Sequence, residues 1–233
     1  MNLISRVKGV FFNPQQTFTA LSKKPHWLDA FLLILIAFTL FSYLAAPYHQ
    51  RDSVQLWENS TKLRETLGEE AYQKRIEQIK NPPQWQKILG FVLAPVGFSI
   101  GLLISSLVIL LMGRMGSLQG NYVQVFSALV HANFVDKLLG NALRIFLITG
   151  KKSVMQVTTS LAILFPNLDY TSKTYIILSQ FDFFQFWLFG ILGFGLSAIF
   201  NISLKRALLI SYGFWLIKSL LNILMAIISM QYV

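Results

Sequence analysis

The chain has 233 residues, of which 54% are hydrophobic and 13% are charged, and it contains no cysteine. Soluble domains carry about 25% charged residues, so this balance predicts a protein that crosses a membrane several times. The absence of cysteine excludes disulfides, thiolate metal sites and cysteine catalysis. The formal charge of +10 is spread among loops between apolar runs, which indicates contact with anionic lipid headgroups and not with nucleic acid.

Residues 1–27 predict an interfacial segment before the first membrane span. Asn13 and Pro14 have the residue types of a helix N-cap and of the first helical position. Lys24 and Trp27 follow, as is typical where a helix enters the headgroup region. A surface helix docked on protein would show the same pattern, so both interpretations stay open. No small-residue cleavage motif follows, and we expect the first apolar run to be retained as a helix.

The first apolar run, residues 28–46, is long enough to cross a bilayer and is predicted to end at Pro47. Residues 48–87 change character, with seven basic and six acidic side chains. Apolar residues recur there with a helical period, and "NPP" at residues 81–83 ends the pattern. We therefore expect a water-facing helical insert. Its charges indicate either a solvated face or a docking surface.

A second span is predicted over residues 88–112. Gly97 and Gly101 form a small-xxx-small pattern in it, which lets helix backbones approach closely in lipid. The turn "GRMGSLQGN" that follows is rich in glycine, but it lacks the Lys-Ser/Thr ending of a phosphate-binding loop and follows a helix. We therefore reject nucleotide binding at this turn.

Three further spans complete the prediction. The third begins near Tyr122 and is followed by a long polar stretch. The fourth covers residues 183–200, and the fifth covers residues 207–230. Gly190 and Gly193 lie in the fourth span, where we expect them to allow close helix packing.

The distribution of basic residues predicts the orientation. Four basic residues closely precede the first span, whereas Arg51 alone follows it closely, and short cytoplasmic flanks concentrate lysine and arginine. We expect one domain, an all-α polytopic integral membrane protein with five transmembrane helices, an amino-terminal interfacial helix and a helical extracytoplasmic loop. The amino terminus is predicted in the cytoplasm and the carboxyl terminus outside, with the chain in the cell (inner or plasma) membrane.

The stretch "FSALVHANFVDKLLGNALRI" places ionisable groups inside the predicted third span. Asp136 and Arg144 share a helix face, Lys137 lies on an adjacent face, and His131 lies deepest. Charges within a span are costly and usually face the bundle interior or an aqueous cavity. The alternative is that the span ends near Val135, which would leave Lys137 and Arg144 at the outer interface. A lone helical histidine is more often a packing residue than a ligand.

Lys218 is a second anomaly, because it lies near the middle of the fifth span with Asn222 on roughly the same side. An unpaired ammonium there would cost on the order of several kcal/mol, so a partner is expected. We predict that Lys218 and Asp136 approach each other across the bundle, directly or through His131 and a water. Asp182 and helix-end carbonyls are the alternative partners.

Patterns typical of enzymes are missing from the sequence. The three histidines (His26, His49 and His131) fall in separate segments without a second ligand at i+3 or i+4. Neither G-x-S-x-G nor H-E-x-x-H occurs. We therefore expect no catalytic residues, no metal site and no cofactor.

Several stretches resemble the Yip (Ypt-interacting protein) family of five-span membrane proteins. They are "NPQQTF" before the first span, "FSALVHANF" in the third, and "FDFFQFWLFGILGFGLSAIFNISLKRALLISYGFW" across the last two. The resemblance implies a cytoplasmic amino terminus. Eukaryotic members are associated with Rab-type GTPases and vesicle traffic, and bacterial members look like accessory proteins that in some cases work beside transporters. The short amino-terminal segment and compact length are similar to bacterial members.

The resemblance and the small-residue helix faces predict a non-enzymatic membrane adaptor or accessory protein. Its expected partner is another membrane protein, such as a transporter, whose assembly or activity it would modulate. The alternative is a transport module for a small solute or ion, with a polar path through the third and fifth helices. An intramembrane enzyme is a third class of function, for which the sequence contains no recognisable set of catalytic residues.

Overall fold

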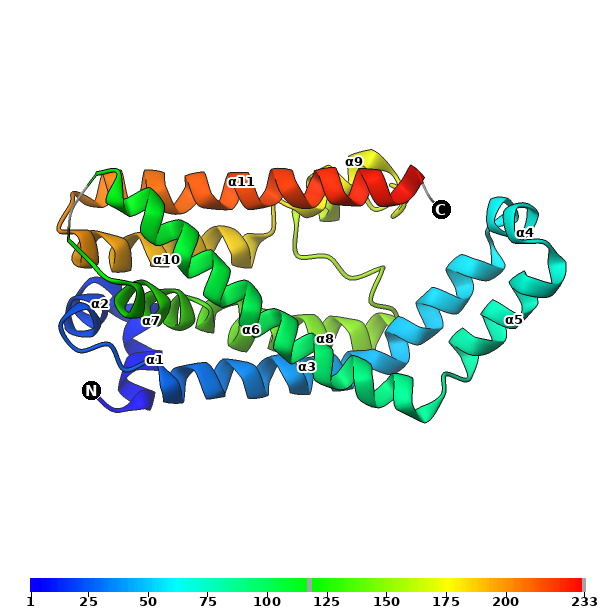
Figure 1. The fold of residues 1–233 in the computed structure, drawn as a ribbon, viewed down its shortest axis with the longest axis horizontal. Helices are drawn as coiled ribbons and strands as arrows, with labels where there is room; N and C mark the ends of the chain where they lie inside the picture. Colours follow the sequence, from blue (N-terminus) through cyan, green and yellow to red (C-terminus); the bar gives the residue numbers. More distant parts are fainter. Residues whose placement is uncertain (117–118, 232–233) are drawn as a thin grey trace.

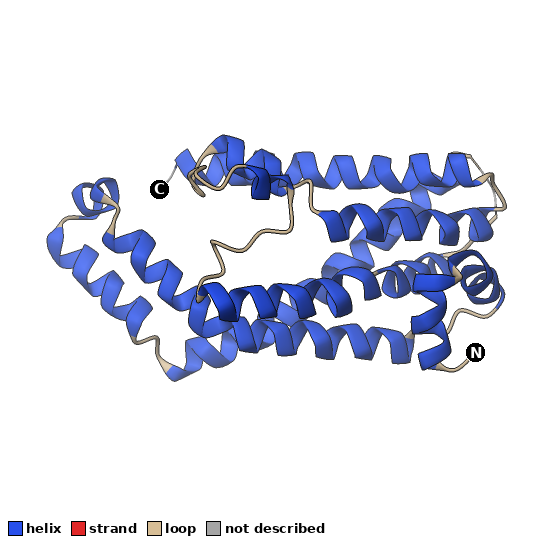
Figure 2. Cartoon of the chain, turned by 180° about the vertical axis from the view of Figure 1, so that it is seen from behind, coloured by secondary structure: helices blue, strands red, loops and turns tan. Residues whose placement is uncertain are grey.

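The computed structural model describes residues 1–116 and 119–231, and this part of the chain is built from helices (Figures 1 and 2). Its single β pairing is an isolated bridge between Ser160 and Asp182. The predicted all-α class is thus confirmed. The long helices run along one axis, and the two chain ends lie at opposite ends of the molecule (Figure 1).

Four helices are long and apolar enough to cross a membrane: α3 (Leu28–Glu58), α6 (Gln84–Arg114), α10 (Phe183–Phe200) and α11 (Leu204–Gln231). The helix does not end with the predicted first span at Pro47, because α3 continues through this proline to Glu58. A proline inside a helix removes one backbone hydrogen bond and does not by itself end the helix. The continuation of α3 packs against α5 and α8, which supports it beyond the proline.

The amino-terminal segment forms two short helices, α1 (Leu3–Phe12) and α2 (Pro14–Lys23). Asn13 occupies the N-cap position of α2, but its side chain makes no capping hydrogen bond. Its carbonyl instead accepts a bond from the Thr17 hydroxyl at 2.9 Å. Val10 and Phe18 are buried in the main core, so this segment is docked on the protein. Phe12 remains 81% exposed, which leaves an apolar side chain free to enter a membrane interface.

The predicted helical insert contains α4 (Thr61–Leu67) and α5 (Glu69–Lys80), which fold back along the end of α3. We call residues 48–80 the arm, because they extend beyond the bundle at the end opposite the amino terminus (Figure 1). Arg64 donates to Glu69 at 2.5 Å, and this hydrogen bond lowers the pKa of the Glu69 carboxyl.

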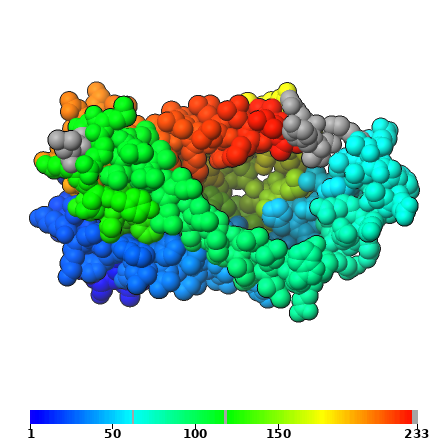
Figure 3. All heavy atoms as spheres, in the orientation of Figure 1, coloured from blue at the N-terminus to red at the C-terminus, as the bar shows by residue number. Residues whose placement is uncertain are grey.

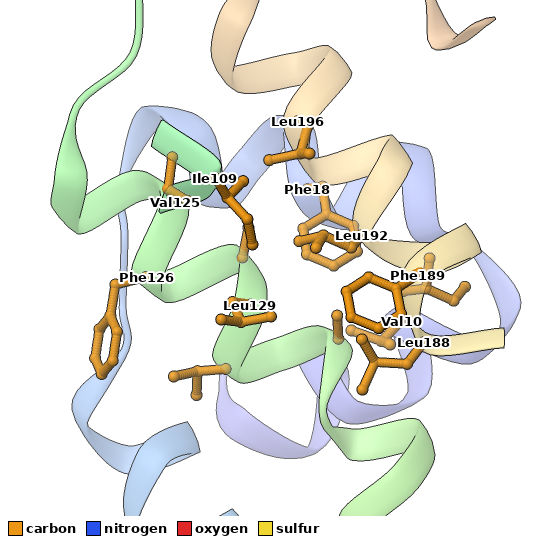
Figure 4. Close-up of a cluster of buried hydrophobic side chains, with 14 of the residues drawn as sticks. Val10, Phe18, Ile109, Val125, Phe126, Leu129, Leu188, Phe189, Leu192 and Leu196 are labelled. Atoms are coloured by element: carbon orange, nitrogen blue, oxygen red, sulfur yellow. The ribbon is translucent and has the colours of Figure 1, made fainter. Parts of the chain in front are cut away.

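The predicted third span is helical but not one regular helix. It consists of α7 (Tyr122–Ala132), the π-helix η1 (Val135–Gly140) and α8 (Asn141–Lys151). Asn121 begins α7 with a capping box, in which it exchanges hydrogen bonds with Gln124. Every side chain from Val125 to Asp136 is buried. Figure 4 shows Val125, Phe126 and Leu129 among apolar side chains of α1, α2, α6 and α10. This segment is therefore the centre of the bundle.

A long connection of mostly irregular structure joins α8 to α10. It contains a 3-10 helix, η2 (Leu161–Leu164), and the short helix α9 (Lys173–Ser179). The connection lies at the same end of the molecule as the arm and the end of α11 (Figures 1 and 2). The amino-terminal helices and the α10–α11 turn lie at the opposite end (Figure 1).

The four glycines predicted to pack between helices behave differently. A Cβ on Gly193 would lie 2.5 Å from a Leu208 methyl, and one on Gly190 would lie 2.9 Å from the Tyr212 hydroxyl, so both allow α10 to approach α11 closely. Cβ atoms on Gly97 and Gly101 would meet nothing within 4 Å. Within the described residues, Gly97 and Gly101 therefore lie in open space and make no close helix contact.

Gly193→Val should lower the thermal stability of the purified protein in mild detergent, because its methyls would overlap α11; overpacking of this kind costs about 1–3 kcal/mol. Gly97→Val is the matched control, since open space surrounds that position. Equal melting temperatures for the two variants would contradict the assigned α10–α11 contact.

Candidate functional site

The predicted intramembrane residues fall into separate groups. His131 lies with the amino-terminal helices, whereas Asp136, Lys137 and Arg144 form an ion cluster farther along the third segment. Lys218 contacts Gln185, and Asn222 donates to Gln180 at 3.3 Å. The expected single cluster is therefore not formed.

Arg6 joins the amino-terminal helices to the bundle. Its side chain is 3% exposed, and its guanidinium donates to the carboxylate of Asp29 at the start of α3. The same guanidinium donates to the carbonyl of His26 at 2.7 Å and lies 3.1 Å from His131 Nε2. One side chain of α1 therefore contacts the loop before α3, α3 itself and α7.

His131 is neutral in this arrangement. Its Nδ1 lies 2.7 Å from the carbonyl of Ser127, which can only accept a hydrogen bond, so Nδ1 carries the proton. Nε2 then accepts from Arg6, which is always protonated. The predicted water-mediated link of His131 to Asp136 and Lys218 is replaced by a structural contact with α1.

Asp136 has both carboxylate oxygens occupied. Lys137 Nζ lies 2.6 Å from one oxygen, and Arg144 donates to the other at 2.8 Å. A Cβ on Gly140 would lie 3.3 Å from Asp136 and 3.1 Å from Arg144, so the absence of a side chain there leaves room for the pair. The intervening π-helix is a feature often found at functional sites.

Arg144 continues the network to α10. It contacts both carboxylate oxygens of Asp182 at 3.1 and 3.2 Å and donates to Thr159 at 3.2 Å. Asp182 is also the N-cap of α10, where it accepts from the backbone of Phe184 and Gln185. Three segments distant in sequence are thus joined by one guanidinium.

The predicted ion pair of Lys218 with Asp136 is wrong. Lys218 Nζ instead donates to the Gln185 side chain at 3.2 Å and lies 5.8 Å from the ring centre of Phe189. Asp182, the alternative partner, is already bound by Arg144. Lys218 forms neither ion pair because Lys137 and Arg144 already bind Asp136, and Arg144 already binds Asp182.

A cavity of about 230 Å³ lies between α6, the third segment, α10 and α11, and Lys137 and Lys218 both line it. Asn133 and Gln185 add polar groups, and Gly101 adds open space. The space-filling view shows the surface hollowed between α6 and α11 (Figure 3). Within residues 1–116 and 119–231, no three histidine, aspartate or glutamate side chains come together as metal ligands would.

The sequence pattern that defines the Yip1 domain matches residues 8–226. The chain belongs to the Yip1 domain family. Searches of curated proteins and of solved structures returned no match.

The three stretches that resemble Yip proteins meet in the core of this Yip1 domain. A Cβ on Gly195, from the last stretch, would lie 3.0 Å from Ala128 and 3.1 Å from Phe18, which come from the other two. These three stretches therefore meet at the contact between α2, α7 and α10.

The sequence analysis did not identify Asp52 as a buried residue, but its side chain is only 4% exposed. Its carboxylate accepts from Ser153, and from the backbone N–H groups of Val154 and Met155 at 2.7 and 2.9 Å. It therefore fastens the base of the arm to the connection after α8. The neighbouring Arg51 and the charged insert gave no sign that this one acid points inward.

Asp136→Asn and Arg144→Met should each lower detergent stability, and the double variant should lose much less than the sum. Breaking a buried pair costs about 3–5 kcal/mol, whereas removing both partners can be nearly neutral. Asp136→Asn combined with Lys218→Met is the matched comparison, and those losses should add. Additivity for Asp136 with Arg144, measured by thermal unfolding, would contradict the pairing.

Proposed function

We propose that this Yip1-family membrane protein is a non-enzymatic adaptor, which docks on another membrane protein such as a transporter and modulates its assembly or activity. The arm is the observation that supports this proposal best. It extends beyond the bundle and carries most of the acidic residues of the chain, many of them exposed. A charged surface of this kind suits recognition of a partner's charged loops.

The arm is held in one shape, which favours binding over a purely solvating role. Gln50 donates to the carbonyls of Ile79 and Lys80 at 2.9 and 2.7 Å. Tyr72 donates to the carbonyl of Trp57 at 2.7 Å. A preorganised surface loses less conformational entropy when it binds, so rigidity of this kind raises affinity.

The topology that we propose has five crossings, with the third segment as the central one. The amino-terminal helices, the end of α6 and the start of α11 lie at one end (Figure 1). The α6 end carries Arg114 and the α11 start carries Lys205 and Arg206, and we assign this end to the cytoplasm because short cytoplasmic loops concentrate basic residues. The arm and the carboxyl terminus then lie outside the cell (inner or plasma) membrane. Anionic lipid headgroups are the expected partners of the basic end.

The transport alternative has one supporting observation, the cavity between Lys137 and Lys218. Against it, His131 of α7 and Asn222 of α11 do not line this cavity, because they contact Arg6 and Gln180 instead. We therefore place the adaptor role first.

Labelling of single cysteines in this cysteine-free chain tests the topology. Ser60→Cys in the arm and Lys173→Cys in the outer connection should react with an impermeant reagent in intact cells. Ser22→Cys and Lys205→Cys should react only after the membrane is opened. Reaction of Ser22→Cys in intact cells would reverse the proposed orientation.

Affinity purification from the native host in mild detergent tests the adaptor role. We expect a membrane protein to co-purify stoichiometrically with the parent chain, and to be lost when residues 60–80 are replaced by a flexible linker. Exchanging Glu70 and Lys74 (Glu70→Lys with Lys74→Glu) is a gentler variant, because it keeps the net charge and inverts the surface pattern of α5.

Lys205→Glu with Arg206→Glu is the control, since it changes charge at the opposite end of the molecule. Unchanged co-purification with the linker variant would contradict docking through the arm. A stable lone protein, whose melting shifts with a small solute, would favour the transport alternative.

A further inference from the structure

The cavity between α6 and α11 contains an ammonium group without a carboxylate partner. Lys218 lines it, donates a hydrogen bond to the Gln185 oxygen and lies over the face of Phe189, and it makes no ion pair within residues 1–116 and 119–231. A neutral amide and a ring face give weaker compensation than an ion pair would. The ammonium is exposed at the cavity and is therefore available to an acceptor from outside the chain.

The nearby carboxylates cannot supply that acceptor. Asp136 is bound by Lys137 and Arg144, and Asp182 is bound by Arg144, Thr159 and the start of α10. Three cations therefore share two acids in this region, and one positive charge is left over. Lys137 lines the same cavity as Lys218, and like charges near each other favour the binding of an anion.

Other groups at the cavity are suited to hold an anion. The Gln185 oxygen accepts from Lys218. The amide nitrogen of Gln185 makes no hydrogen bond within residues 1–116 and 119–231, so it can donate to a ligand. Asn133 has one N–H directed to the Leu129 carbonyl and a second available. Two ammonium groups and two amide donors match the several acceptor oxygens of a phosphate or carboxylate.

The walls of the cavity are mostly apolar, and its size exceeds what a single water needs. Phe98, Leu102 and Phe214 contribute to the lining, and the volume is about 230 Å³, against roughly 10–15 Å³ for one water. The opening between α6 and α11 seen in Figure 3 faces sideways from two membrane-spanning helices. A ligand could therefore enter from the bilayer.

We propose that this cavity is a binding site for a phosphate or carboxylate anion, with Lys218 as its main ligand and Lys137, Asn133 and Gln185 as the supporting donors. The anion is carried by a lipid headgroup or is free in solution. The site is independent of the arm, so it stands or falls separately from the adaptor role.

The test uses the full chain purified in a neutral detergent. Native mass spectrometry compares binding of phosphatidylglycerol with phosphatidylcholine of the same acyl chains, and thermal unfolding at constant ionic strength measures stabilisation by inorganic phosphate. Lys218→Met should weaken anion binding about tenfold, as expected for losing one charged hydrogen bond. Lys173→Met is the matched control, because it removes an exposed lysine that lies outside both the cavity and the basic end.

Gly101→Leu is a second variant that keeps every charge. Open space surrounds this glycine, so the new side chain should fill the cavity without disturbing the fold. It should weaken binding as Lys218→Met does, and it decides the question if Lys218→Met fails to fold.

A preference for phosphatidylglycerol that both cavity variants remove would establish the site with a lipid ligand. Stabilisation by phosphate alone, removed by the same variants, would establish it with a soluble anion. Equal binding by the parent chain and the cavity variants, or no binding of either probe, would overturn the proposal.

Discussion

The packing of the central segment against the start of α10 depends on the guanidinium of Arg144. It binds Asp136 of the central segment and Asp182 at the start of α10, and it donates to Thr159 of the connection between them. Buried charges are costly unless they are paired and hydrogen-bonded, so none of these groups is well placed until all have docked. Assembly of the central segment, the connection and α10 is therefore coupled through one side chain. This coupling gives Asp136 and Arg144 a structural role, since their charges pair with each other and with Asp182.

A second arginine performs the matching task at the other end of the central segment. Arg6 joins α1 to Asp29 and His131, while the apolar side chains between the two arginines form the core shown in Figure 4. Moving the apolar surface of a helix from lipid to a helix interface gains little free energy, because lipid tails are as apolar as the side chains. Packing and polar contacts therefore decide which helices associate. The two arginines and the α10 glycines supply that specificity. Lys218 is the charged group of this region that they leave without a carboxylate.

Local patterns in the sequence predicted the helices well, but they did not predict the contacts between segments that are distant in the sequence. Residues 183–200 were predicted as a span and form α10 because an uninterrupted apolar run between polar ends has few alternative structures. Pro47 was given too much weight as a helix end, because its cost is small beside the packing of α3. The predicted pairing of Asp136 with Lys218 failed because Lys137 and Arg144 occupy both carboxylate oxygens of Asp136, although the sequence had placed Asp136 and Arg144 on one helix face. Asp182 directly before an apolar run was the available clue to a capping role.

Hydrogen–deuterium exchange on Arg144→Met tests the structural role of the ion network most directly. The account predicts faster exchange in the connection before α10 and in the first turn of α10, where Asp182 would lose its cation. Exchange in α2 and the first half of α7 should be unchanged, since Arg6 and the core hold them independently. Unchanged exchange around residues 158–186, or a uniform increase throughout the chain, would contradict the claim that Arg144 joins these segments.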